Sequence, residues 1–150
     1  MSKLSTLTRS LSLVVLASLL SACAILRPPY VPVEGVASTD VYFVDRTSKT
    51  SGFLDYKVQH GDLKPRFIVG EVFEETSQMV VYKTQLPLDT DVTVIADYDM
   101  GNYTCDVDIA VNLTEPRDYY VHSTFSYNEG CRLGVLYQEG NDWVPVPILK

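Results

Sequence analysis

The feature that most constrains the fold is a series of short segments in which polar and apolar residues alternate. Turn-forming stretches such as TSKTSG, HGDLKP, DMGN and EGND separate these segments. No window shows a sustained helical period. The expected strands are residues 41–46, 53–58, 67–74, 78–84, 91–97, 105–113, 117–127, 131–137 and 142–148. The pattern predicts an all-β chain that folds as a β-sandwich or a small barrel, and we favour a small antiparallel β-sandwich.

An apolar segment lies near the N-terminus of the chain. Lys3 and Arg9 precede the run LSLVVLASLLSACAIL, residues 11–26, which is shorter than the roughly 20 apolar residues that a bilayer span requires. The run ends in Leu20-Ser21-Ala22-Cys23, which resembles the lipobox of bacterial lipoproteins. The resemblance implies a signal peptide over residues 1–22, cleavage before Cys23, and acylation of the Cys23 sulfur and amino group. A soluble secreted form and an uncleaved anchor are the alternatives.

The residue after the lipobox cysteine bears on localisation. In Gram-negative lipoproteins an aspartate there usually retains the protein in the inner membrane, and here the residue is Ala24. The resemblance therefore implies a lipid anchor in the outer membrane, with the domain on the periplasmic face.

The charge of the chain limits its partners. Cleavage would remove two cations and no acid, so the formal charge of −7 becomes about −9. An acidic chain without a basic patch argues against nucleic acid as a partner. Its length suits one compact domain, which we expect over residues 39–150.

A proline-rich stretch follows the lipobox. Pro28, Pro29 and Pro32 favour an extended backbone, so residues 23–38 are expected to hold the lipidated cysteine and a tether. The alternative is a first strand that begins near Val31.

Two cysteines remain besides Cys23, and both open expected strands. In an oxidising compartment Cys105 and Cys131 should form one disulfide; two buried free thiols are the alternative. A flat three-stranded meander would hold them about 10 Å apart, too far for a bond. Either strand 131–137 crosses to the opposite sheet, or Cys105 lies in a loop that folds over. The expected core-facing residues are Cys105, Val107, Ile109, Val111, Leu113, Tyr119, Val121, Phe125, Tyr127, Cys131, Leu133, Val135 and Tyr137.

The C-terminal segment predicts an edge strand. Pro145 and Pro147 remove N–H donors along one edge, while Val144, Val146 and Ile148 can pair along the other. A proline-rich tail without strand structure is the alternative.

The sequence offers little catalytic or metal chemistry. Asp97 and Asp99 before Gly101 partly match a calcium loop, although a solvated acidic turn is favoured. The two histidines, His60 and His122, have no nearby companion ligand and are expected at the surface. There is no G-x-S-x-G elbow and no glycine-rich phosphate loop. We therefore expect no enzyme activity, no metal and no cofactor.

Two function classes remain. The first is a structural or interaction subunit of an envelope assembly; the second is a stand-alone binding module for glycan, peptidoglycan or a small ligand. Small envelope lipoproteins with an immunoglobulin-like or transthyretin-like sandwich form a group that this chain resembles in size and strand pattern. The oligomeric state stays open. The candidate interface residues are Tyr98, Tyr103, Asp106, Asp108, Tyr120, His122 and Trp143.

Overall fold

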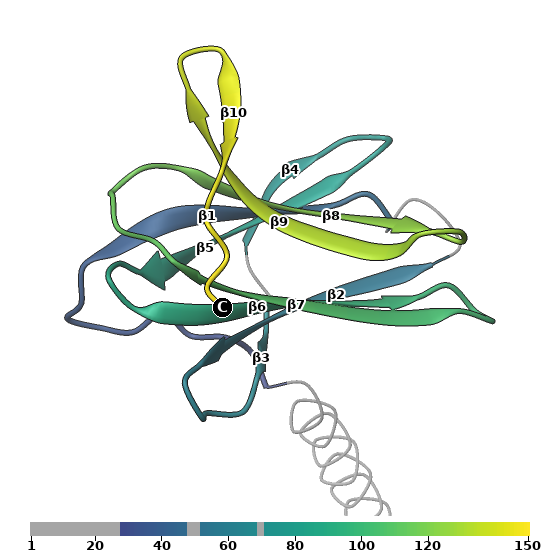
Figure 1. Ribbon diagram of the computed structural model, residues 1–150, viewed down its shortest axis with the longest axis horizontal. Helices are drawn as coiled ribbons and strands as arrows, with labels where there is room; N and C mark the ends of the chain where they lie inside the picture. Colours follow the sequence, from purple (N-terminus) through teal and green to yellow (C-terminus); the bar gives the residue numbers. More distant parts are fainter. Residues whose placement is uncertain (1–27, 48–51, 69–70) are drawn as a thin grey trace, which may run out of the picture.

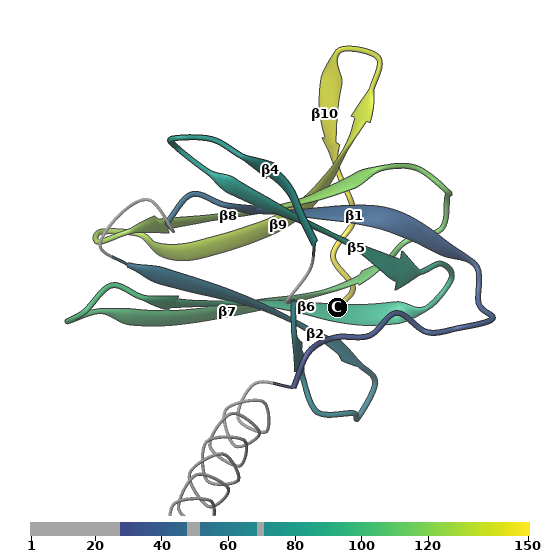
Figure 2. The same ribbon diagram turned by 180° about the vertical axis from the view of Figure 1, so that it is seen from behind.

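The computed structural model describes residues 28–47, 52–68 and 71–150, and in this part of the chain two sheets pack face to face (Figures 1 and 2). The six-stranded sheet has the order β10-β9-β8-β1-β5-β4 and the four-stranded sheet the order β3-β2-β6-β7. The predicted all-β sandwich is confirmed. The strands are β1 (Ser38–Asp45), β2 (Phe53–His60), β3 (Arg66–Phe67), β4 (Glu71–Glu75), β5 (Val80–Pro87), β6 (Asp91–Asp99), β7 (Thr104–Asn112), β8 (Tyr119–Ser126), β9 (Gly130–Glu139) and β10 (Asp142–Pro145).

Strand β1 occupies an inner position in the six-stranded sheet. It pairs antiparallel with β5 and parallel with β8, and the other strand pairs are antiparallel. A parallel pair needs a long connection, and here the chain completes the four-stranded sheet between β1 and β8. Within the described residues there is no helix of the length and hydropathy that crossing a membrane requires.

The prediction of one strand over residues 67–74 is wrong. Residues 66–67 form β3 at the edge of the four-stranded sheet, whereas β4 lies at the edge of the six-stranded sheet. Residues 69–70, between them, lie outside the described part of the chain. Alternation alone does not reveal such a change of sheet, because either sheet can accept the same local pattern.

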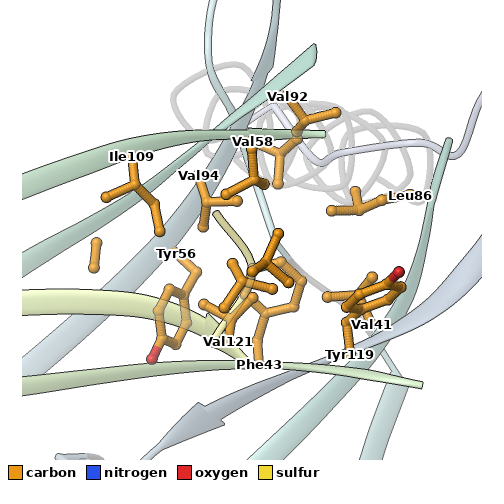
Figure 3. Close-up of a cluster of buried hydrophobic side chains, with 14 of the residues drawn as sticks. Val41, Phe43, Tyr56, Val58, Leu86, Val92, Val94, Ile109, Tyr119 and Val121 are labelled. Atoms are coloured by element: carbon orange, nitrogen blue, oxygen red, sulfur yellow. The ribbon is translucent and has the colours of Figure 1, made fainter. Parts of the chain in front are cut away.

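The apolar core lies between the two sheets (Figure 3). Val41, Phe43 and Val121 point into it from the six-stranded sheet and meet Val58 and Val94 of the four-stranded sheet. All five side chains are fully buried. The expected core face of residues 105–113 is confirmed at its C-terminal half, where Ile109, Val111 and Leu113 are buried.

A chain of hydrogen bonds crosses this core. The Tyr98 hydroxyl donates to Ser123 Oγ at 2.7 Å, and the Tyr56 hydroxyl donates to the carbonyl oxygen of Val44 at 2.8 Å. Tyr56 Oη and Ser123 Oγ lie 2.6 Å apart. Burial raises the pKa of both phenols, so both stay protonated, and Ser123 must donate to Tyr56. Each hydroxyl proton therefore has an acceptor, and strands β2 and β6 are tied to β1 and β8.

The disulfide joins the sheets at one edge of the sandwich. Cys105 lies on β7 and Cys131 on β9, with their Cα atoms 6.1 Å apart. These strands belong to different sheets, which confirms the predicted bond and the alternative in which residues 131–137 cross to the opposite sheet. The flat meander is excluded.

The C-terminal segment closes the same edge. β10 is an edge strand, as predicted, but strand structure ends at Pro145 and not at residue 148. The Val146 N–H donates to the Val135 carbonyl of β9, and the Leu149 N–H donates to the Ala110 carbonyl of β7, both at 2.8 Å. The Val146 N–H lies between the two prolines and the Leu149 N–H lies beyond them, so the segment bonds once to each sheet.

Part of the expected tether belongs to the domain. The Tyr30 N–H donates to the Phe67 carbonyl at 2.7 Å, and the Phe67 N–H donates to the Pro28 carbonyl at 3.0 Å. Tyr30 is buried, whereas Val31 is exposed, so neither a free tether over residues 28–38 nor a strand from Val31 describes this segment. The segment predicted as a signal peptide, residues 1–22, lies outside the described residues, as do Cys23 and Ala24.

Replacing both cysteines, Cys105→Ser with Cys131→Ser, should lower the free energy of unfolding by about 3.5 kcal/mol. The value follows from the entropy of closing a loop with a sequence separation of 26 residues in the unfolded chain. Urea unfolding of the oxidised wild type and the double variant measures the change. An unchanged unfolding midpoint would contradict the role of the bond as an inter-sheet link.

Ser123→Ala should destabilise the domain by about 1–3 kcal/mol, because it leaves the Tyr98 hydroxyl without an acceptor and the Tyr56 oxygen without a donor in the core. Tyr98→Phe should cost less, since it removes a donor and orphans none. In the double variant the two losses should not add, because both changes break the same bond. Additive losses in urea unfolding would show that the hydroxyls do not act as a chain.

Candidate functional site

The outer face of the six-stranded sheet carries apolar residues where solvent-facing polar ones are expected. In β1, Val41 and Phe43 point into the core, so Tyr42 and Val44 point outward. Tyr42 is nevertheless only 6% exposed, because neighbouring rings cover it. A two-layer sandwich normally exposes polar side chains on its outer faces. This sheet is therefore apolar on both faces at its centre.

A groove of about 460 Å³ crosses this outer face. It runs from edge strand β4, over β5, β1 and β8, to β9 and β10. Its lining residues are Tyr42, Val44, Arg46, Phe73, Glu74, Met79, Val81, Tyr120, His122, Leu136 and Trp143. We call this surface the aromatic groove.

Four rings form a continuous row in the aromatic groove. Tyr42 and Tyr120 are direct neighbours in the β1–β8 register and stack with centroids 5.0 Å apart. Phe73 packs edge-on against Tyr42 at 4.9 Å, and Trp143 packs edge-on against Tyr120 at 5.0 Å. The outer two rings, Phe73 and Trp143, are exposed. The row therefore offers an aromatic contact at each end of a firmly packed centre.

Three polar groups accompany the rings. Arg46 and Glu74 line the aromatic groove, and neither forms an ion pair with another described residue. Burial, and to a smaller extent the charge of Arg46, lower the pKa of His122. His122 is therefore neutral at pH 7, and Arg46 and Glu74 are the charges available to a ligand here.

Gly134 has no side chain to cover the outer face of the sheet beside His122. It lies opposite His122 in the β8–β9 register, and its neighbour Val135 faces the core. A Cβ atom added at Gly134 would meet no atom within 4 Å. A larger side chain there would extend over the outer face without disturbing the fold.

The structure brings three of the predicted interface residues together. Tyr120, His122 and Trp143 come from β8 and β10 and all line the aromatic groove. Sequence reasoning missed the partners that complete it, namely Tyr42, Val44, Arg46, Phe73, Glu74, Met79, Val81 and Leu136. One signal was present, since the unbroken apolar run VYFV in β1 is typical of a strand buried on both faces.

The prediction for Tyr98 is wrong. Predicted as a candidate interface residue, it is only 3% exposed and donates to Ser123 inside the core. β6 extends to Asp99, so Tyr98 continues the inward face of the strand. A buried side chain of this kind cannot contact a partner.

Tyr103 lies apart from the aromatic groove, in the turn between β6 and β7. It packs edge-on against Tyr127 at 4.9 Å, and both rings are exposed. Tyr127 was expected to face the core, but β8 ends at Ser126 and the residue belongs to the following turn. These two rings lie at the end of the sandwich that carries the Cys105–Cys131 disulfide.

The remaining acidic candidates lie on the outer face of the four-stranded sheet. Asp106 pairs in register with Asp97, and Asp108 is exposed two residues further on. Asp97 forms an ion pair with Lys57, and Asp99 accepts a hydrogen bond from the Gly101 N–H at 3.0 Å. Among the described residues no group of three or more potential ligands could hold a metal ion. Among these residues, Asp97 and Asp99 therefore have no third acidic, histidine or cysteine side chain with which to bind calcium.

Comparison of the chain with protein-family models, with curated proteins and with solved structures found no match. Geometry and sequence alone therefore guide the interpretation of the aromatic groove. What it offers is recognition, through apolar and aromatic contacts and through Arg46 and Glu74, which form no ion pair with another described residue.

Stability should fall as the pH is lowered from 7 to 5. The pKa values of His122 and His60 are both lowered by burial, so below pH ~6.5 the unfolded chain binds more protons than the folded domain. His122→Gln should reduce this loss, and adding His60→Gln should reduce it further. Urea unfolding across this pH range measures both effects. An unchanged pH dependence in His122→Gln would contradict the burial of that imidazole.

Proposed function

We propose that this protein is an outer-membrane lipoprotein that acts as an interaction subunit of an envelope assembly, with the aromatic groove as its contact surface. The lipobox around Cys23 supports the anchor and the compartment. The partner would be another envelope protein, bound on the periplasmic side of the membrane.

The apolar outer face of the six-stranded sheet is the observation that carries this proposal. Exposed apolar patches rimmed by polar groups are typical of protein-binding surfaces. Aromatic residues and arginine are enriched at the energetic centres of interfaces, and here Trp143, Phe73 and Arg46 line one groove. A hollow of about 460 Å³ suits a few side chains of a partner more than a broad flat contact.

Edge strand β4 suggests how a partner segment could bind. β4 pairs with β5 on one side only, and all five of its residues are exposed. Its Phe73 and Glu74 line the aromatic groove. An extended partner segment could pair with this edge and place alternate side chains in the groove, as in strand addition.

A glycan or peptidoglycan fragment is the second candidate ligand. Exposed aromatic rings beside Arg46 and Glu74 would suit a charged sugar polymer. Sugar binding uses the open faces of rings, however, and the face of Tyr42 is covered by Tyr120. The ring arrangement therefore favours the protein partner.

A photo-crosslinking amino acid at the position of Phe73 or Trp143 should capture one envelope protein in cells. The matched control is Asp106, which is exposed on the outer face of the other sheet. Trp143→Ala and Gly134→Leu should each reduce capture from the Phe73 position several-fold, because they remove a contact or fill the groove, with little effect on stability.

Equal capture from the Asp106 position, or no capture from either groove position, would contradict the proposal that the protein is an interaction subunit that binds through the aromatic groove. Titration of the purified protein with muropeptides tests the second candidate, and binding that Trp143→Ala abolishes would favour it. Mass spectrometry of the N-terminal peptide tests acylation of Cys23 separately.

A further inference from the structure

The described chain begins at a fixed point on the sandwich. Residues 28–30 hydrogen-bond to Phe67 of edge strand β3, as described above, and Tyr30 stacks on His60 with centroids 5.6 Å apart. Both partners belong to the β2–β3 hairpin. Pro28 is therefore held against this hairpin by backbone hydrogen bonds and by a buried ring.

The lipid would be close to this point. Four residues, 24–27, separate Cys23 from Pro28, so their Cα atoms lie at most about 18 Å apart even in a fully extended chain. Acyl chains on Cys23 would therefore keep the β2–β3 hairpin near the membrane surface. This distance limit depends on the chain length alone.

The surface around the hairpin differs from the rest of this acidic chain. Val31, Val33 and Leu63 are 70%, 48% and 68% exposed and line a hollow together with Lys64 and Arg66. We call these five residues the hairpin patch. Lys64 and Arg66 form no ion pair with another described residue, whereas Lys57, Lys83, Arg117 and Arg132 each have an acidic partner. Glu34 and Asp62 are the neighbouring carboxylates along the chain.

We propose that the hairpin patch docks on the phospholipid leaflet that holds the acyl chains of Cys23. This inference rests on the lipid anchor of the proposed function. Val31, Val33 and Leu63 would enter the interface between headgroups and acyl chains, and Lys64 and Arg66 would meet lipid phosphates. The apolar contact and the ionic contact are each weak, but together they suffice to hold the patch on the membrane, because the lipid anchor keeps the patch at a high effective concentration near it.

The distribution of charge favours this orientation. Asp55, Asp97 and Asp106 form one register row across the four-stranded sheet. His60 lies at the end of β2 that leads into the β2–β3 hairpin, and Asp55 lies five residues before it. The acidic row is therefore about 17 Å from the hairpin end of β2, measured along the strand. An anionic membrane would attract the unpaired cations of the hairpin patch and repel this acidic row.

The same orientation leaves the aromatic groove accessible. The β9–β10 hairpin, which carries Trp143, projects from the side of the sandwich opposite the β2–β3 hairpin in both views (Figures 1 and 2). Docking at one end would therefore point Trp143 away from the lipid. A lipid surface at the hairpin patch and a protein at the aromatic groove can bind together.

The test measures the depth of a probe on the acylated mature chain, residues 23–150, in vesicles of phosphatidylethanolamine and phosphatidylglycerol. A spin label is attached through Leu63→Cys, or through Asn141→Cys in the β9–β10 turn as the matched control. The Leu63 label should respond to a lipid-soluble relaxation agent several-fold more than the Asn141 label does. Adding Lys64→Glu with Arg66→Glu should return the Leu63 label to the value of the control.

Equal exposure of both labels to a water-soluble agent would overturn the docking proposal. Shielding of the Leu63 label from both agents would also overturn it, because protein and not lipid would then cover the patch. The mass of the N-terminal peptide is measured on the same sample. An unacylated Cys23 would refute the anchor itself, whereas an acylated protein with a water-exposed Leu63 label would refute only the docking.

Discussion

Strand β1 is the element on which the rest of the structure depends, because it is apolar on both faces. Val41 and Phe43 seal the core between the sheets, while Tyr42 and Val44 form the centre of the aromatic groove. β1 also joins β5 to β8, which lie far apart in sequence, by an antiparallel and a parallel ladder. A polar residue at Tyr42 would give an ordinary solvent-facing sheet, and without Phe43 the core would lose its largest fully buried side chain. Fold and candidate site thus share one strand.

The two sheets are held in register by links of different kinds. Apolar burial provides attraction without direction. The Tyr98–Ser123–Tyr56 hydrogen bonds, the Cys105–Cys131 bond and the tail bonds to Val135 and Ala110 provide direction. The disulfide and the tail both act between β7 and β9, so that edge of the sandwich is closed. A closed edge resists sliding of one sheet over the other. The row of rings in the aromatic groove lies within the six-stranded sheet, where the pairing of β1 with β8 aligns Tyr42 with Tyr120.

The two proposed contact surfaces lie toward opposite sides of the sandwich. The hairpin patch lies beside Pro28, where the chain leads back to Cys23, and the aromatic groove extends to Trp143 on the β9–β10 hairpin (Figure 1). The proposals depend on different chemistry. The first uses scattered apolar residues with unpaired cations, which suits a deformable lipid surface. The second uses packed rings with fixed geometry, which suits a protein segment of defined shape.

The sequence by itself determined the all-β strand content and the inward face of residues 109–113, because alternation is a local pattern. It indicated the pairing of Cys105 with Cys131, because these are the two cysteines that remain when Cys23 is set aside. It also indicated Tyr120, His122 and Trp143, but with no means of placing them together. The tertiary structure decided the division of residues 67–74 between two sheets, the burial of Tyr98 and the joining of Tyr42, Phe73, Tyr120 and Trp143 in one groove. These features follow from which strands pair and in which register, and strand pairing depends on contacts between distant residues that no local pattern specifies.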